Sequence, residues 1–384
     1  MLDKLILTNI MIILGLFLLF INPALSYILI LLYYFFLNNK NWIMIFLLLL
    51  NIGIIAIFKL PNSDHYRYYR FFEDIGILTK EEFYNFLIGQ KDYIFHIYMY
   101  LCSKYLNYKF WISGLTIATF LFLILSLKDQ KKFLGKKLII FFFDPFNIKR
   151  WTLGIALYIF GEKYTKKYKI LGILTHLSIL ILPISKIFSK FIPNKIIYKK
   201  KVVVLIFMFI IGIIFSRMFS LFLKQVGVHE IYLNWRIDSM LIEGNLKARI
   251  VNVYTVYLDY AIFFFIFFSK KNAIDLSERK IEMLITFILI NSLCINLVMS
   301  RRLLQIFIIF YVYNYFEKID KRQIKKIILI MLLSKYFLLF VVNIKYGYKV
   351  KSYPILSNVT KEKIMLNNKN EPYKNIYKKW KGKK

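Results

Sequence analysis

The chain has 384 residues, of which 59% are hydrophobic, and apolar runs recur from its start to about position 342. This share exceeds that of soluble domains, so the composition excludes an ordinary soluble protein and indicates a polytopic membrane protein. The net charge of +34 comes from 55 Lys and Arg against 21 Asp and Glu. Because the basic residues cluster between apolar runs, we expect them to set membrane orientation and meet anionic headgroups, and we expect no nucleic acid partner.

The apolar runs predict an all-α, polytopic transmembrane helix bundle with 10–13 membrane segments, since one span needs about 20 residues. The first run lacks a small-residue cleavage site, so we expect a retained span. We expect Pro23 to separate the first two helices and Pro183 to kink a later one. Residues 1–342 form one predicted domain, followed by a basic, partly disordered tail over 343–384. The predicted helices are 5–21, 25–37, 42–58, 93–106, 110–127, 138–161, 168–188, 202–222, 250–268, 281–299, 303–316 and 327–342.

The segment 138–161 is the unusual one, because its two apolar halves are each too short to cross a bilayer. Basic clusters at 128–137 and 163–169 flank it, and the positive-inside tendency places both in the cytoplasm. A re-entrant hairpin near 138–161, with its polar tip shielded by protein, satisfies both conditions. A single kinked span with one cluster outside is the alternative.

Two ionisable residues lie inside apolar stretches, Arg150 before residues 151–160 and His176 within 171–182. A charge at membrane depth costs about 2.5–3.5 kcal/mol, so such a residue usually faces a polar cavity. A guanidinium suits phosphate or carboxylate oxygens, although Arg150 could instead be an interfacial anchor or pair with Asp144. His176 could be a general base or a structural hydrogen-bonding residue.

Other polar residues are weaker candidates for the site. Asp64, Tyr68 and Arg70 combine a carboxylate, an aromatic ring and a guanidinium, which suits a sugar-binding surface or an interfacial aromatic belt. Asp92, just before the short apolar segment 93–106, and His96, inside it, are further candidates. The predicted topology places five arginines at the outer face, where they would bind an anionic ligand: Arg217, Arg236, Arg249, Arg301 and Arg302.

The chain contains no phosphate-binding glycine loop, metalloprotease helix, serine-nucleophile elbow or Cys-pair metal motif. Its two cysteines, Cys102 and Cys294, are far apart in apolar surroundings, which argues against a disulfide framework or a metal cluster. We therefore expect no metal and no cofactor.

Four short motifs carry a resemblance to a known family. Asp64 and Tyr68 keep the acid and the second tyrosine of an Asp-Tyr-x-x-Tyr pattern, with His65 in between. The other three are Asp92-Tyr93-Ile94-Phe95, Arg150-Trp151-Thr152-Leu153-Gly154, in which Trp151 replaces the usual Gln, and His176-Leu177-Ser178. In this order the motifs resemble the EpsG-like branch of the polysaccharide polymerases, related in role to the O-antigen (Wzy) polymerases.

The resemblance implies a membrane-embedded glycosyltransferase of the bacterial inner membrane. It would transfer a growing glycan from undecaprenyl pyrophosphate to a hydroxyl of another lipid-linked repeat unit, at the outer face and without metal or nucleotide. Such a transfer needs cations on the departing pyrophosphate and a base for the attacking hydroxyl. We assign the first role to Arg150 with the outer arginines, and the second to His176 or Asp64. Membrane lipids are expected partners, and a chain-length regulator is a further candidate.

Three other functions fit the same composition. A flippase of lipid-linked oligosaccharides would also need cations in a cavity, but paired repeats should then show a second broken segment, and the sequence has no clear partner for the one near 145. A membrane scaffold makes no use of Arg150 at depth. An acyltransferase lacks a convincing His-Asp motif here.

Overall fold

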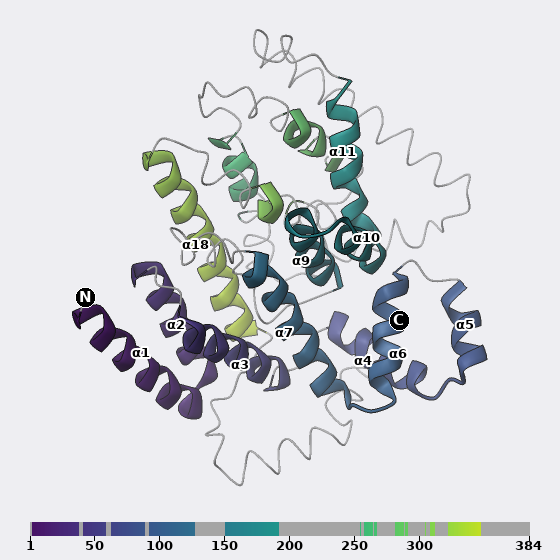
Figure 1. Cartoon of the computed structure of the whole chain (residues 1–384), viewed down its shortest axis with the longest axis horizontal. Coiled ribbons are helices and arrows are strands. Elements are labelled where there is room, and N and C mark those ends of the chain that lie inside the picture. The colour runs from purple at the N-terminus through teal and green to yellow at the C-terminus, as the bar shows by residue number, and fades with distance from the viewer. Residues whose placement is uncertain are drawn as a thin grey trace. The chain divides into compact units, whose positions relative to one another are not determined.

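The computed structural model describes residues 2–37, 41–58, 63–88, 92–126, 150–191 and 322–346, together with short stretches between 254 and 311 (Figure 1). Within these residues all regular structure is helical, which confirms the all-α class. One described helix, α7 (Tyr108–Ser126), is long and apolar enough to cross a membrane. The number of 10–13 membrane segments stays a prediction.

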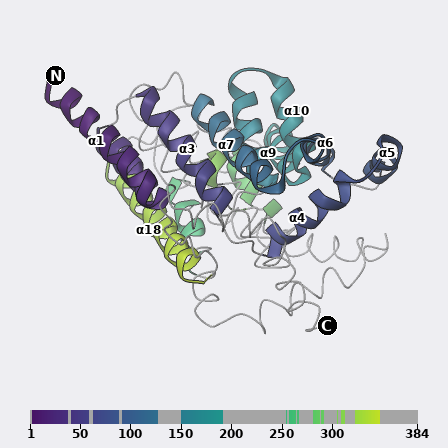
Figure 2. The ribbon, with the colours of Figure 1, turned by 90° about the horizontal axis from the view of Figure 1, so that it is seen from below.

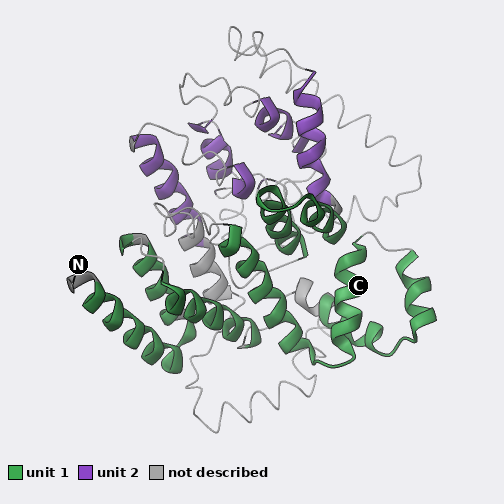
Figure 3. Cartoon of the chain, viewed as in Figure 1, with its two compact units in different colours: residues 1–176, 339–384 green, residues 177–338 purple. Residues whose placement is uncertain are grey.

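Two compact units divide the chain, one formed by Met1–His176 with Leu339–Lys384 and the other by Leu177–Leu338 (Figure 3). The predicted end of the transmembrane domain at residue 342 falls inside α18 (Arg322–Tyr346). The tail beyond this helix lies outside the described residues, so the single domain over 1–342 stays a prediction.

The first unit begins with three apolar helices, α1 (Leu2–Ile21), α2 (Pro23–Leu37) and α3 (Trp42–Phe58). Pro23 is the first residue of α2, a position where its missing N–H costs nothing, so the predicted separation is confirmed. The three helices are joined by buried hydrogen bonds, from the amide of Asn51 to the hydroxyl of Ser26 (3.0 Å) and from Ser26 to the carbonyl of Gly15 (2.6 Å).

Three short helices follow, α4 (Ser63–Gly76), α5 (Lys80–Ile88) and α6 (Tyr93–Ser103), and Figures 1 and 2 show them beside one another. A capping box starts α5, in which the backbone N–H of Thr79 donates to Glu82 (2.8 Å) and that of Glu82 donates to the Thr79 hydroxyl (3.3 Å). Eleven residues of helix extend about 16 Å, so α6 is too short to cross a bilayer.

A tight helical hairpin, α9 (Arg150–Lys163) and α10 (Lys166–Thr175), positions the candidate site. A Cβ atom on Gly172 would lie 2.5 Å from the carbonyl oxygen of Gly154, and one on Gly161 would lie 2.4 Å from the backbone nitrogen of Lys169. These contacts make the helices antiparallel, with the start of α9 and the end of α10 at the same end of the hairpin. Only glycine permits such close backbone approach.

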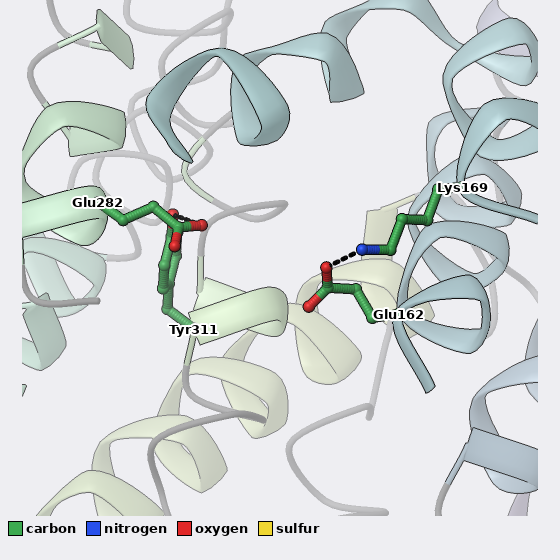
Figure 4. A network of polar contacts seen from close by, with 4 residues as sticks. All are labelled: Glu162, Lys169, Glu282 and Tyr311. Atoms are coloured by element: carbon green, nitrogen blue, oxygen red, sulfur yellow. Dashed lines mark hydrogen bonds and ion pairs between the residues drawn. The ribbon is translucent and has the colours of Figure 1, made fainter. Parts of the chain in front are cut away.

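The other end of the hairpin is tied to α7. Lys163 donates to the carbonyl of Ser126 (2.8 Å), and the Tyr164 hydroxyl donates to the carbonyl of Leu125 (2.9 Å). Both carbonyls belong to the last turn of α7, where cations and donors satisfy groups without a helical partner. At the same end of the hairpin, Lys169 of α10 forms an ion pair with Glu162 of α9 (Figure 4).

The prediction of one continuous helix over 168–188 is wrong, because the helix is interrupted at His176. The chain leaves α10 at His176, whose backbone is extended (φ −156°, ψ 110°), and resumes as a 3₁₀ turn (Leu177–Leu180) and α11 (Ile181–Ser189). Pro183 is the third residue of α11, where a proline lacks no intrahelical bond. No intrahelical hydrogen bond is therefore lost at Pro183, and the expected kink there is replaced by a break at His176, seven residues earlier in the chain.

Polar side chains are buried in the second unit. Asp259 and Lys335 form an ion pair whose side chains are 0% and 1% exposed. The hydroxyl of Tyr311 donates to Glu282 (3.2 Å) and lies 2.8 Å from that of Thr286, as Figure 4 shows for the first pair. Two buried polar clusters therefore lie in this unit.

Candidate functional site

Arg150 and Asp92 form the centre of the candidate site, with Nη1 of the guanidinium 2.8 Å from Oδ2 of the carboxylate. Asp92 precedes α6 as its N-cap residue, yet its side chain makes no capping hydrogen bond and turns to Arg150. The carboxylate is almost fully buried, whereas 37% of the arginine side chain is exposed. The guanidinium is therefore anchored by a buried carboxylate, while part of the arginine side chain stays exposed.

Packing of α9 explains why Arg150 stays in place. Arg150 is the first residue of this helix, and the nine residues after it, 151–159, are all buried. The unpaired backbone N–H groups of a first helical turn carry a partial positive charge, which adds to that of the guanidinium. A helix start with a held arginine is suited to phosphate or pyrophosphate oxygens.

His176 lies at the same end of the hairpin as Arg150. It is the C-cap residue of α10, and its backbone N–H bonds the carbonyl of Gly172 (3.2 Å). The helix break there gives the imidazole a position that a continuous helix over 168–188 would not have offered. The structure thus brings the two residues with the strongest sequence signals to one end of one helix pair.

His96 is a further imidazole beside this pair. It follows Asp92 by one turn of α6, is 3% exposed, and its Nδ1 has no hydrogen-bond partner among the described residues. Burial, helped by the nearby Arg150 cation, lowers the pKa of His96 to about 4. The imidazole is therefore neutral at physiological pH.

The structure places the other candidates differently. Tyr68 is buried, with its ring centroid 5.5 Å from that of Phe95 and 6.5 Å from that of Trp111, so it packs inside the helix cluster. Arg70 is exposed on α4. Asp64 belongs to the first turn of α4, and its side chain lies outside the described residues. Five arginines also lie outside them: Arg217, Arg236, Arg249, Arg301 and Arg302.

Sequence reasoning missed two pairings. It offered Asp144 as the partner of Arg150, whereas the structure shows Asp92 on another helix. It also passed over Asp259 and Lys335, although each is a charge inside a predicted span, at 259 in 250–268 and at 335 in 327–342. Opposite charges within two apolar runs were the available signal for that pair.

A family comparison now bears on this geometry. The model of the EpsG family matches residues 50–356, most of the chain. The chain belongs to the EpsG family. No curated protein and no solved structure matches it.

Membership in the EpsG family confirms the resemblance and suggests a polysaccharide-polymerase type of role. EpsG family polymerases are membrane proteins, with which the helices agree, and the family implies a lipid-linked saccharide as substrate in general terms. The matched range contains Asp92, Arg150 and His176. The arrangement around Arg150 therefore lies within the part of the chain that matches the family model.

Proposed function

We propose that this EpsG-family protein polymerises undecaprenyl-pyrophosphate-linked oligosaccharide repeat units at the outer face of the bacterial inner membrane. The observation that carries the proposal is the pairing of Arg150 with Asp92 at the end of the α9–α10 hairpin where His176 also lies. The reaction breaks the bond between the glycan and pyrophosphate and forms a bond to a hydroxyl of the acceptor unit. Pyrophosphate departs on its lipid, and the hydroxyl proton goes to a base.

Arg150 is suited to the leaving group. A guanidinium is a permanent cation. Asp92 holds that of Arg150 in place, and 37% of the arginine side chain stays exposed in the pair. Negative charge grows on the pyrophosphate as the glycosidic bond breaks, and a preorganised cation stabilises that charge without moving. The five arginines of the predicted outer face are proposed as ligands of an anionic substrate.

His176 or Asp64 is proposed as the base. A base in this position takes the proton of the attacking hydroxyl, which typically accelerates a transfer by 10²–10⁴-fold. His176 is favoured by its place at the hairpin end with Arg150. Arg70 and Asp92 are proposed to support substrate binding, Asp92 through Arg150, whereas Tyr68 packs inside the helix cluster and would support the site only through its fold.

Glycan chain length tests the proposal. Arg150→Ala should remain in the membrane at the wild-type level yet reduce the surface glycan to single repeat units. Arg150→Lys should restore part of the chain length, because an ammonium keeps the charge and loses the paired donors. Lys167→Ala removes an exposed cation from α10 and is the matched control, with wild-type chains expected.

Wild-type chain lengths in Arg150→Ala would overturn the proposal. The test also separates the polymerase from a flippase of the same lipid-linked oligosaccharides. A flippase defect would accumulate repeat units on the inner leaflet, which leaflet-resolved labelling detects, whereas a polymerase defect leaves single units on the outer one.

A further inference from the structure

Three aromatic side chains from three helices pack together near the Arg150–Asp92 pair, and one of them is an imidazole. The ring centroid of His96 (α6) lies 5.6 Å from that of Phe86 (α5) and 6.1 Å from that of Phe71 (α4). The two phenylalanine centroids are 6.4 Å apart. The residues thus form one aromatic cluster, which we call the Phe71–Phe86–His96 cluster.

Two of the three rings reach the surface, and the third is buried and polar. Phe71 is 40% exposed and Phe86 is half-buried, whereas His96 is buried. Its Nδ1 has no hydrogen-bond partner among the described residues, and a buried polar atom without a partner is costly. A ligand that donates a hydrogen bond to this nitrogen would therefore bind with a more favourable free energy than the same ligand at a purely apolar cluster.

The protonation state of the imidazole defines that donor. His96 is neutral at physiological pH, so one of its ring nitrogens accepts a hydrogen bond. A hydroxyl is a donor of suitable size, and the phenylalanine rings present apolar faces. A ring with C–H faces and hydroxyl edges, that is a sugar, matches both features.

The position of the cluster indicates which sugar. His96 lies one helical turn from Asp92, whose carboxylate holds Arg150. If Arg150 binds the pyrophosphate, the group one turn away is the sugar attached to it. We propose that the Phe71–Phe86–His96 cluster is the subsite for the sugar linked directly to pyrophosphate, with the imidazole of His96 accepting a hydrogen bond from one of its hydroxyls.

This inference rests on the proposed function, and two lipid probes separate them. The first probe is undecaprenyl pyrophosphate, and the second is the lipid-linked repeat unit extracted from cells lacking this chain. Dissociation constants are measured for both probes on the full chain in nanodiscs. Wild type should bind the second probe more tightly than the first, whereas Arg150→Ala should bind both more weakly.

The subsite variants should act on the sugar alone. His96→Leu and Phe71→Ala should weaken binding of the lipid-linked repeat unit by about tenfold, and leave binding of undecaprenyl pyrophosphate within twofold of wild type. His96→Gln keeps an acceptor and should recover part of the loss. Tyr84→Ala, which removes an exposed ring from the same helix as Phe86, is the control and should change neither constant.

Four results would overturn the subsite. His96→Leu could leave both constants unchanged, in which case the cluster only packs α4, α5 and α6 together. It could weaken both probes equally, in which case His96 acts through Arg150 or the fold. If Arg150→Ala lowers the affinity for both probes while wild type does not distinguish them, the subsite fails and the proposed function stands. If wild type binds neither probe, both fail.

Discussion

Asp92 anchors Arg150 across two helices, from the residue before α6 to the first residue of α9. The carboxylate gives up the usual capping of its own helix to do so. The carboxylate that holds the cation is buried, whereas 37% of the arginine side chain is exposed. The pair therefore contributes both to the stability of the fold and to the proposed binding of the leaving group.

Reversing this pair separates its two roles. Asp92→Asn should lower the free energy of unfolding by about 1–3 kcal/mol, less than for a fully buried pair because Arg150 is partly exposed, and should shorten the glycan. The double variant D92R/R150D should regain stability through the reversed pair, yet still yield single repeat units, because the cation has moved to the wrong helix. Thermal unfolding in detergent and glycan electrophoresis measure the two effects.

The pair Glu162–Lys169 provides the control for this reversal. Both side chains are 25% exposed and lie toward the opposite end of the hairpin. E162K/K169E should keep both stability and glycan length. Full-length glycan from D92R/R150D would contradict the assigned role of Arg150.

The closeness of α9 and α10 predicts opposite effects of two alanine substitutions. Gly172→Ala places a methyl group 2.5 Å from the carbonyl oxygen of Gly154 and 2.9 Å from the backbone nitrogen of Tyr158, so the helices must separate. We expect a loss of about 1–3 kcal/mol of unfolding free energy. At Gly114 in α7 the nearest atom is the Tyr98 hydroxyl oxygen at 3.4 Å, so Gly114→Ala should be neutral or stabilise by up to about 1 kcal/mol. Equal melting temperatures for the two variants would contradict this packing.

The ion pair of Asp259 and Lys335 predicts non-additive stability. Removing one partner leaves a buried charge, so Lys335→Met or Asp259→Leu should each cost about 3–5 kcal/mol. The double variant should be more stable than either single one, since no charge is left without a partner. A double-mutant cycle of melting temperatures measures this coupling, and additive losses would show that the pair is not formed.

The lowered pKa of His96 predicts how its protonation and the stability depend on pH. Folding lowers this pKa from 6.5 to about 4, so the unfolded chain takes up the proton first as the pH falls. Above about pH 6.5 the imidazole is neutral in both the folded and the unfolded chain, so it does not change the free energy of unfolding. Between pH 6.5 and pH 4 the unfolded chain is stabilised by protonation, so the free energy of unfolding decreases as the pH falls. Histidine-labelled NMR spectra, assigned with His96→Gln, should show His96 neutral at pH 5.5.

Burial is the larger cause of the lowered pKa of His96, and the positive charge of Arg150 is the second. Arg150→Gln should therefore raise the pKa of His96 while leaving it below 6.5, because desolvation persists. A pKa of His96 that does not respond to Arg150→Gln would show that the two residues are farther apart than the structure places them.

Composition and apolar run length by themselves determined that this chain is helical, because both properties act locally and repeat along the sequence. They located α3 at its observed bounds and the break before Pro23. The charges at Arg150 and His176 stood out because apolar surroundings make an ionisable group costly, and the four spaced motifs were enough to indicate the family that was then shown.

Only the tertiary structure decided which groups meet. The partner of Arg150 depends on how α6 packs near the start of α9, and no local signal distinguishes Asp92 from Asp144. The break at His176 and the antiparallel contact of Gly172 with Gly154 likewise bring Arg150 and His176 to one end of the hairpin. Residues distant in the chain come together through packing of whole helices, which a single sequence does not encode at any one position.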